Sequence, residues 1–469
     1  MTVRIVSYNI LVPIYANQPD HYLKCRPEFL QIDHRWNLIQ SHLEQEIVHH
    51  ENTIICLQEL SLTLLPKIEL FFRRLNYTFF HNLYGKRYND YMGVGMAIPL
   101  SMQLNSISFI KIGDHIRSIS KPREEKANMF TWGWNLYQFA MSKFIELASD
   151  PWETAMAKAN TLICIEVVID NKPIHIGTYH MPCLYKKPDV MAIHCSVLKD
   201  LMFQLAAGQD FILAGDFNIK PLDICYQVLT EKDYNGCNLP ESSTYEISYR
   251  PNTEQVLKSA YREKNGAEPV YTDFSDTPSS PNFCATLDYI FFNGHLTVEK
   301  VLELPDHPSS ESYPDETHPS DHLMIAATFQ LSEDFLFFWT HYLFHTRWLY
   351  KHIHKKHHIF KQPTGVVFVI ANPWESLLQN QLAVWIVPIF FKEKHLFTIC
   401  LWVFIRVYQT INAHSGYDLP YISAQYYFPW LMSGTLQHDY HHQHAKMNYG
   451  SFLTLWDRFM NTHQLQKDD

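Results

Sequence analysis

Acidic, amide and histidine side chains recur at the ends of β-like runs in the first two thirds of the chain. The runs are RIVSYNIL, TIICLQEL, DFILAGDFNIKP and ATLDYIFF, and the polar residues at such ends are Asn9, Glu59, Asp216, Asn218, Asp288, Asp321 and His322. Phosphoester cleavage requires neutralised phosphoryl oxygens, an activated water and a stabilised leaving oxygen. Mg²⁺ held by one or two carboxylates can supply the first and last of these, and a histidine paired with an aspartate can stabilise the developing charge. These residue types predict a Mg²⁺-dependent site for phosphoester cleavage.

A second set of potential ligands lies in the last third of the chain. His341 and His345 are four residues apart, which places both on one face of a helix. Two HxxHH patterns and one HSGYDLP segment add His354, His357, His358, His414, His438, His441 and His442. Nine imidazoles are about the number that two iron ions need where carboxylates are scarce, and imidazole suits iron or zinc. The pattern predicts a centre of two iron ions that could activate O₂ for attack on a C–H bond.

Each of these residues also has an ordinary structural interpretation. Asn9 could cap a turn, Asp288 could simply begin a strand, and the Asp321–His322 pair could lie in a solvated loop. His352 and His444, taken alone, are more typical of surface or stacking histidines than of ligands. The joint order and spacing of the motifs favours the two sites.

Helical patterns separate the β-like runs, as in Arg35–His49 and Val190–Ala206. This alternation predicts a layered α/β or α+β domain with its site at strand ends. Residues 101–159 are interpreted as an insertion. Within it, Trp134–Leu147 is predicted to be a helix that covers the sheet, although its aromatic residues could instead stack bases.

Composition limits the class of protein. With 46% apolar and 18% charged residues among 469, the chain is globular, and its length predicts two or three domains. A net charge of −10 excludes a general nucleic-acid-binding surface, so nucleic acid would be held by a local site. Nine scattered cysteines without a CxxC pair, and an N-terminus without a signal-peptide layout, predict an intracellular protein. Histidine becomes more than twice as dense after Leu331, which predicts domains 1–331 and 332–469.

Seven motifs of the first domain stand in a recognisable order: SYNIL, CLQEL, GVGMAIP, TYHMPC, LAGDFNIKP, TLDYIFF and HPSDHLMI. In this order they resemble the endonuclease/exonuclease/phosphatase superfamily. SYNILVPIYA, the KC-R-P segment at Lys24–Pro27, and LKSAYREKNGAEPVYTDFS look like its deadenylase, nocturnin and angel branch. The resemblance implies a four-layer β-sandwich of the DNase I-like type and an RNA 3′ end or a nucleotide as substrate.

The same resemblance implies roles for single residues. Glu59 would be the principal Mg²⁺ ligand with Asn9 beside it, and Asp321 would lie near the metal. Asp216 would orient or activate the attacking water, and Asn218 would hold the phosphate. His322, oriented by Asp288, would contact the scissile phosphate. His180 would contact phosphate or serve the leaving group, and Asn160 would support this arrangement.

The segments DFLFFWTHYLFHTRWLYKHIHKKHH, HSGYDLP, LQHDYHHQH and LWDRFMNT cover about residues 334–462. They resemble the fatty acid hydroxylase superfamily, and its methylsterol monooxygenase branch in particular. This implies an all-α, histidine-rich, membrane-associated domain with two Fe ions, a sterol or fatty acid substrate and an electron-donor protein. Relatives typically carry further transmembrane helices before the first histidine box, so the lipid cavity is expected to be incomplete.

Two apolar runs, Leu382–Phe391 and Leu396–Ile405, are each too short to span a bilayer. Extended to about 377–391 and 395–411, they are predicted to form a hairpin that dips into the membrane. Arg347, Lys351, Lys355 and Lys356 would then face anionic headgroups at the cytosolic face of an internal membrane such as the endoplasmic reticulum. The alternative is a core hairpin of a soluble domain.

Three hypotheses for the whole chain follow. The first is a fusion with two active centres, one cleaving phosphodiesters in RNA or a nucleotide and one oxidising lipid. The second is a phosphoesterase whose C-terminal part is only a membrane anchor or a metal-binding remnant. The third gives the phosphoesterase a phospholipid headgroup as substrate, as in sphingomyelinase-like relatives, and the deadenylase-like LKSAYREKNGAEP segment argues against it.

Overall fold

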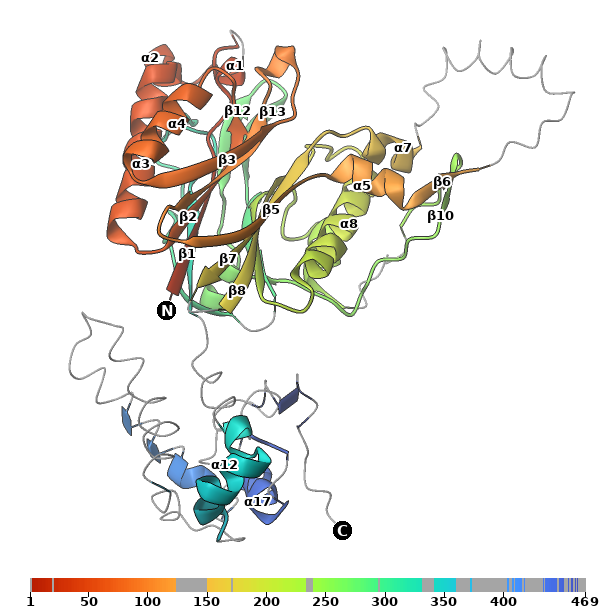
Figure 1. Ribbon diagram of the computed structural model, residues 1–469. Helices are drawn as coiled ribbons and strands as arrows, with labels where there is room; N and C mark the ends of the chain where they lie inside the picture. Colours follow the sequence, from red (N-terminus) through yellow and green to blue (C-terminus); the bar gives the residue numbers. More distant parts are fainter. Residues whose placement is uncertain are drawn as a thin grey trace, which may run out of the picture. The chain divides into compact units, whose positions relative to one another are not determined.

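The computed structural model divides the chain into two compact units, Thr2–Gln330 and Leu331–Asp469, with Met1 grouped with the second (Figure 1). In the first unit the structure describes residues 2–18, 21–123, 150–169, 172–232, 239–293 and 296–330. In the second it describes residues 341–359, 372, 403–404, 407–408, 410–415, 417, 433, 435–444, 447–450, 454, 457–458, 460 and 462.

The first sheet of the N-terminal unit has the strand order β15-β16-β1-β2-β4-β3. Its strands are β1 (Thr2–Asn9), β2 (Thr53–Leu60), β3 (Tyr77–Leu83), β4 (Gly93–Pro99), β15 (Thr297–Val301) and β16 (Ile325–Gln330). The central strand β1 is parallel to β2 and antiparallel to β16. It is almost entirely buried, as expected of a β-branched run covered on both faces.

The second sheet has the order β11-β14-β9-β8-β7-β5. Its strands are β5 (Gln103–Lys111), β7 (Thr161–Ile169), β8 (Lys172–His180), β9 (Phe211–Asp216), β11 (Lys258–Ser259) and β14 (Asp288–Phe292). Strand β9 is parallel to β8 and antiparallel to β14. Two small antiparallel pairs, β6 (Ser120–Pro122) with β10 (Tyr245–Ile247) and β12 (Asp273–Thr277) with β13 (Ser280–Ala285), complete the strands of the described residues.

The two sheets pack face to face, with helices on their outer faces (Figure 1). The described helices of this unit are α1 (Pro13–Ala16), α2 (Pro27–Leu30), α3 (Ile32–His49), α4 (Leu65–Arg74), η1 (Arg87–Asn89), α5 (Ile112–Ser118), α7 (Pro151–Met156), α8 (Pro188–Ala206), α9 (Ile224–Thr230) and α10 (Ala260–Asn265). Helices α3 and α4 share one core with the first sheet, and α5, α7, α8 and α9 share another with the second. This is the predicted four-layer sandwich.

A polar bridge crosses the interior between the sheets. Gln58 of β2 accepts a hydrogen bond from Ser7 (3.3 Å) and donates one to Thr178 of β8 (3.2 Å). All three side chains are buried. Because a buried amide is costly unless it is hydrogen-bonded, the bridge favours one register of the sheets, just behind the site.

The interpretation of residues 101–159 as an insertion is wrong for its described parts. Strand β5 pairs with β7 along its whole length and forms an edge of the second sheet. Trp152 of α7 is buried in the core that α8 shares. These segments are integral to the sandwich, and the predicted Trp134–Leu147 helix lies outside the described residues.

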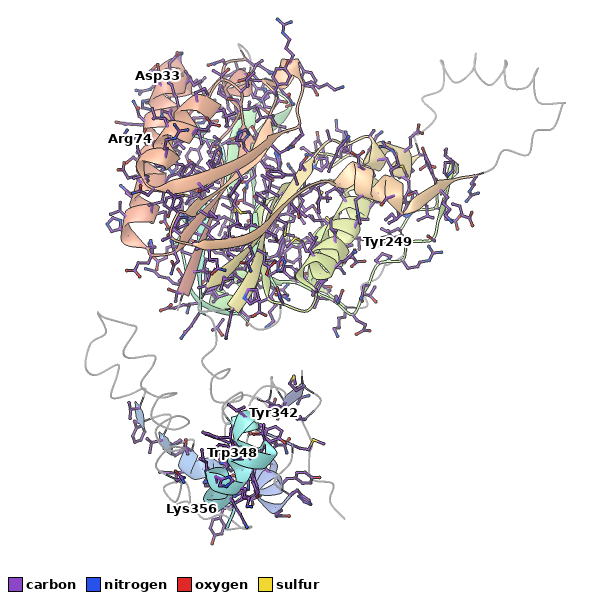
Figure 2. The ribbon with its side chains drawn as sticks, viewed as in Figure 1. Asp33, Arg74, Tyr249, Tyr342, Trp348 and Lys356 are labelled. Carbon is purple, nitrogen blue, oxygen red and sulfur yellow. The ribbon has the colours of Figure 1, made fainter. Side chains whose placement is uncertain are left out.

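In the C-terminal unit the described elements are α12 (Arg347–His352), η2 (His354–Ile359) and α17 (Thr435–His444). Trp348 and Lys356 are exposed on the outer surface of α12 and η2 (Figure 2). The apolar runs of the predicted membrane hairpin fall outside the described residues except for a few positions between 403 and 411. Among the residues with a described structure, no helix is both long and apolar enough to cross a bilayer.

Candidate active site and candidate metal centre

Strand pairing brings the predicted site residues to one edge of the sandwich. Asn9 is opposite Gln58 in the parallel pair β1–β2, and His180 is opposite Asp216 in the parallel pair β8–β9. Antiparallel β14 places its first residue, Asp288, opposite Asp216 as well. Because parallel strands end at the same edge, residues from separate motifs become neighbours.

Asn9 links the two sheets at this edge. Its Nδ2 donates hydrogen bonds to Glu59 Oε1 (3.2 Å) and to Asp216 Oδ2 (3.0 Å). Its Oδ1 accepts from the backbone N–H of Leu11, so the residue also stabilises the turn after β1. Glu59 lies at a bulge of β2 with a left-handed φ of 58°, and its Oε2 accepts from the N–H of Val12 (2.8 Å). The Glu59 carboxylate is thus held from two sides.

His322 lies among carboxylates. Its Nδ1 donates to Asp288 Oδ2 (2.8 Å), which also accepts from the Thr272 hydroxyl (2.7 Å). Its Nε2 is 3.1 Å from Asp273 Oδ2 and 3.8 Å from Asp216 Oδ2. Burial disfavours a charged imidazole, but the three acids outweigh it and raise the pKa of His322 well above its ordinary value. His322 is therefore a protonated donor suited to an anionic phosphoryl oxygen.

His180 approaches Asp216 from the other side. Its Nε2 is 3.4 Å from Asp216 Oδ2, and its Nδ1 is hydrogen-bonded to the Tyr84 hydroxyl (3.3 Å). Asn160 donates to the backbone oxygen of His180 (2.8 Å), so its role is to support this strand end. Burial is the largest influence on Asp216 and raises its pKa, although His322 lowers it. A carboxylate with a raised pKa is a better proton acceptor for water.

The GDFN segment is shaped by its glycine. A Cβ at Gly215 would lie 1.8 Å from the backbone oxygen of Tyr179, so any side chain would force β9 away from β8. Asn218 follows with a left-handed φ of 51°; its N–H donates to Asp216 Oδ1 (2.9 Å) and its Nδ2 to the oxygen of Met181 (3.0 Å). Asn218 is therefore fixed beside Asp216.

A cavity of about 580 Å³ opens at this edge and is lined by Glu59, His180, Asp216, Asn218, Asp321 and His322 among others. Two triplets, Asp216–Asp288–His322 and Asp273–Asp321–His322, have ligand atoms within 4.8 Å of one another, and Glu59 belongs to neither. Glu59 and Asp321 nevertheless line the same cavity with oxygen donors, the chemistry that Mg²⁺ prefers. The donor set fits a hard divalent cation.

The nine predicted histidine ligands of the C-terminal unit separate into two groups. The five-histidine group contains His341, His345, His354, His358 and His441, and the four-histidine group contains His357, His414, His438 and His442. Within each group the potential ligand atoms lie within 4.8 Å of one another. All nine predicted residues are therefore brought together, as two adjoining groups.

The ring nitrogens converge at distances typical of ligands to one ion. His354 and His358 approach through their Nε2 atoms (3.0 Å), as do His414 and His438 (2.9 Å) and His357 and His414 (3.3 Å). Nitrogens that each lie about 2.1 Å from one ion are roughly 3.0–3.4 Å apart in octahedral or tetrahedral geometry. The residues therefore fit two ions with imidazole ligands.

Backbone carbonyls orient some of these rings. His341 Nδ1 donates to the oxygen of Tyr449 (2.7 Å), and His414 Nδ1 to that of Thr410 (2.8 Å). This leaves Nε2 as the lone-pair nitrogen, the usual arrangement of a metal-binding histidine. Burial lowers the pKa of His414 to about 4, which keeps its ring neutral. By contrast, His352 and His444 are exposed and rest against Trp348 and Tyr440.

Comparison with known proteins assigns each of the two parts of the chain to a protein family. The family model "Endonuclease/Exonuclease/phosphatase family" matches residues 8–322, and "Fatty acid hydroxylase" matches residues 326–462. A very-long-chain aldehyde decarbonylase, GL1-11 of Oryza sativa subsp. indica, is 34% identical over 196 residues, which are 40% of this chain and 71% of the relative. The chain belongs to both families. It is a fusion of a phosphatase-family unit and a hydroxylase-family unit.

Two further comparisons refine this assignment. The C-4 methylsterol oxidase erg25 of Schizosaccharomyces pombe is 36% identical over 136 residues, 28% of this chain and 44% of the relative. The chain thus spans less than half the length of that oxidase. The crystal structure of ANGEL2 covers 71% of this chain and 96% of its own, with 18% identity and a TM-score of 0.51. This likeness shows the DNase I-like fold of the phosphatase-family unit.

Sequence reasoning missed Asp273 and Tyr22 at the phosphatase-family site, and Arg35 behind it. Asp273 is buried at the start of β12 and contacts His322, and burial raises its pKa well above the ordinary value. Tyr22 donates its hydroxyl to Asp321 Oδ2 (2.6 Å). Asp273 lies in TDFS, part of a segment that carried the resemblance, whereas Tyr22 lies two residues before the KC-R-P segment. Neither follows a β-like run, so the strand-end pattern could not identify them.

Arg35 of α3 joins two loops of this site. Its buried guanidinium donates to the carbonyls of Ile10, Leu11 (2.6 Å) and Pro319, which flank the loops that carry Asn9 and His322. Replacing Arg35 with methionine should lower the unfolding free energy of the unit by about 3 kcal/mol, because buried carbonyls lose their donors.

The measurement is a urea titration of the full chain in which hydrolase activity reports unfolding. The urea concentration at the midpoint should be lower in the variant than in the parent. Arg74→Met is the matched control, since Arg74 is exposed at the end of α4 (Figure 2). A surface change of this kind should shift the unfolding free energy by less than about 0.5 kcal/mol. Equal midpoints for the two variants would remove Arg35 from this role.

Proposed function

We propose that the phosphatase-family unit is a Mg²⁺-dependent phosphodiesterase acting on an RNA 3′ end or a nucleotide, and that the hydroxylase-family unit is a di-iron lipid hydroxylase. The observation that carries the first half is the meeting of Glu59, Asp216 and His322 at one cavity, where Asn9 binds the first two and Asp288 binds His322. Asn9 and Glu59 come from the first sheet, Asp216 and Asp288 come from the second, and His322 comes from the segment just before β16.

The arrangement supports hydrolysis by direct attack of water. Asp216 accepts the proton of the attacking water, since its pKa is raised by burial. His322 donates a hydrogen bond to a phosphoryl oxygen, and the Asp288 carboxylate keeps it charged and oriented. Asn218 lines the cavity beside them and holds the phosphate. Bound at Glu59 and Asp321, Mg²⁺ would neutralise charge on the phosphoryl and leaving oxygens.

The cavity also favours an anionic, nucleotide-like substrate. Lys86 and Lys158 line it, and neither has an ion-pair partner within the described parts of 2–330. Two free ammonium groups suit phosphates beyond the scissile one. ANGEL2 is described as a 2′,3′-cyclic phosphatase in complex with adenosine-2′,3′-vanadate, which makes a cyclic phosphate at an RNA 3′ end a first substrate to test.

The experiment compares four substrates with the purified full chain and Mg²⁺: an RNA oligonucleotide ending in a 2′,3′-cyclic phosphate, poly(A), a dinucleotide phosphate and sphingomyelin. We expect turnover of at least one of the three nucleotide substrates, and none of sphingomyelin. Asp288→Asn should reduce that turnover by about 10²–10³-fold, because His322 loses its carboxylate partner. Turnover of sphingomyelin alone would replace this proposal with the phospholipid alternative.

For the hydroxylase-family unit, the two converging histidine groups support two iron ions that would supply oxygen activation. A sterol or fatty acid is the proposed substrate, with an electron-donor protein and the cytosolic face of an internal membrane as setting. The test is oxygen-dependent product formation from a 4-methylsterol and a long-chain fatty acid, alongside flotation with phospholipid vesicles. Vesicle binding without any product would favour the alternative in which this unit is only an anchor.

A further inference from the structure

The turn Met447–Gly450 supplies hydrogen-bond acceptors to two members of the five-histidine group. His441 Nδ1 donates to the oxygen of Met447 (2.6 Å), and His341 Nδ1 to the oxygen of Tyr449 (2.7 Å). The Tyr449 ring also packs against His441, with ring centres 5.4 Å apart. The position of this turn therefore decides how two of the five rings are oriented.

The turn needs an anchor, because two of its residues have left-handed backbones. Met447 has a φ of 63° and Asn448 a φ of 51°, a conformation that costs free energy in residues other than glycine. The Asn448 side chain donates to the oxygen of Gln437 on α17 (3.1 Å), and its N–H donates to the oxygen of Thr462 (2.8 Å). These bonds attach the turn at one end only.

Asp457 provides the other attachment. Its carboxylate accepts from the N–H groups of Tyr449 and Gly450, each at 2.6 Å, and from the Thr462 hydroxyl at 2.8 Å. The side chain is only 2% exposed, so these are charge-assisted bonds shielded from water. Asp457 comes from the LWDRFMNT segment, for which the sequence analysis predicts no separate role.

We propose that Asp457 is a positioning residue that sets the metal affinity of the five-histidine group through this turn. The Tyr449 carbonyl that accepts from His341 shares its peptide group with the Gly450 N–H that Asp457 binds. The Met447 carbonyl that accepts from His441 shares its peptide group with the Asn448 N–H, which donates to Thr462, and Asp457 in turn binds the Thr462 hydroxyl. Both carbonyls accept from Nδ1, so that each Nε2 is directed to the ion. In the four-histidine group, His414 instead donates to Thr410 in its own helical turn, and none of the described bonds of Asp457 reaches a residue of this group. This inference rests on the proposed binding of two iron ions.

The test is Asp457→Asn in the full chain, purified from iron-supplemented cells. The asparagine has the same size but presents an amino group to one of the two N–H donors, so the turn should loosen. Iron per chain is measured after a graded series of chelator concentrations. We expect one of the two irons to be lost at 10–100-fold lower chelator concentration than in the parent, while the other is unchanged.

Three further measurements make the outcome decisive. Thr462→Val removes one donor to the carboxylate and should give the same selective loss, but a smaller one, even if Asp457→Asn folds poorly. Asp439→Asn removes the only other described acid of this unit. In this variant both irons should resist the chelator as well as they do in the parent. Hydrolysis by the phosphatase-family unit should be unchanged in all three variants.

Parental chelator resistance of both irons in Asp457→Asn and Thr462→Val would overturn the inference, as would equal loss of both irons in Thr462→Val. A parent that holds no iron would instead overturn the di-iron proposal, and this inference with it. The two failures are therefore distinguishable.

Discussion

Glu59→Gln should reduce Mg²⁺-dependent phosphodiester hydrolysis by about 10³-fold or more, the scale of losing several kcal/mol of charge stabilisation. The carboxylate is held by Asn9 and by the N–H of Val12 on the wall of the cavity. Glutamine keeps the size of the side chain but removes the negative charge that a Mg²⁺ ligand needs. The measurement is kcat over a range of Mg²⁺ concentrations. Raising the Mg²⁺ concentration should not restore the parental rate.

The matched control is Glu69→Gln. Glu69 lies on α4, is 45% exposed in its side chain and pairs only with His81 among the described residues. Its replacement should leave kcat unchanged. Parental activity of Glu59→Gln, with both variants unfolding at the same urea concentration, would remove Glu59 from the mechanism.

If the hydroxylase-family unit binds two irons as proposed, replacing His357 and His441 together with alanine should remove both. The two residues come from different histidine groups, so each single variant should lose one ion and the double variant two. His441 Nε2 is buried without a hydrogen-bond partner in the described structure, as expected of a nitrogen reserved for a metal. Metal analysis of the purified full chain gives the count.

The matched control is the pair His352→Ala and His444→Ala. These histidines are exposed, and they flank the same segments without belonging to either group. Their replacement should leave the iron content at two. An iron content that falls equally in the control pair would contradict the assignment of ligands, while retention in the His357 and His441 double variant would remove both from the metal centre.

The sequence could indicate the residues of both sites because their motifs are local. Glu59, Asp216 and His322 each occupy a short segment with its own pattern, and HxxHH repeats place histidines on one side of a helical turn. What joins these segments is strand register and long-range hydrogen bonding, such as Asp288 opposite Asp216. Register depends on pairing partners far away in the chain, and no local pattern specifies it.

The residues that were missed act through side chains rather than through a motif. Tyr22 and Asp273 reach the site from loops, and Arg35 reaches it from the buried face of a helix that looks ordinary in sequence. The interpretation of residues 101–159 as an insertion failed for a different reason. Strand β5 is half exposed at a sheet edge, so it lacks the continuous apolar run that marked the central strands.

The pairing of β1 with β16 has a consequence for biosynthesis. Thr2 is aligned with Gln330, so the earliest and latest segments of the sandwich are hydrogen-bonded neighbours. A nascent chain cannot complete this ladder until its last strand has left the ribosome, and such distant contacts form slowly. The hydrolytic site therefore cannot be completed until synthesis has passed Gln330, when the ribosome is already translating the histidine-rich segment that follows.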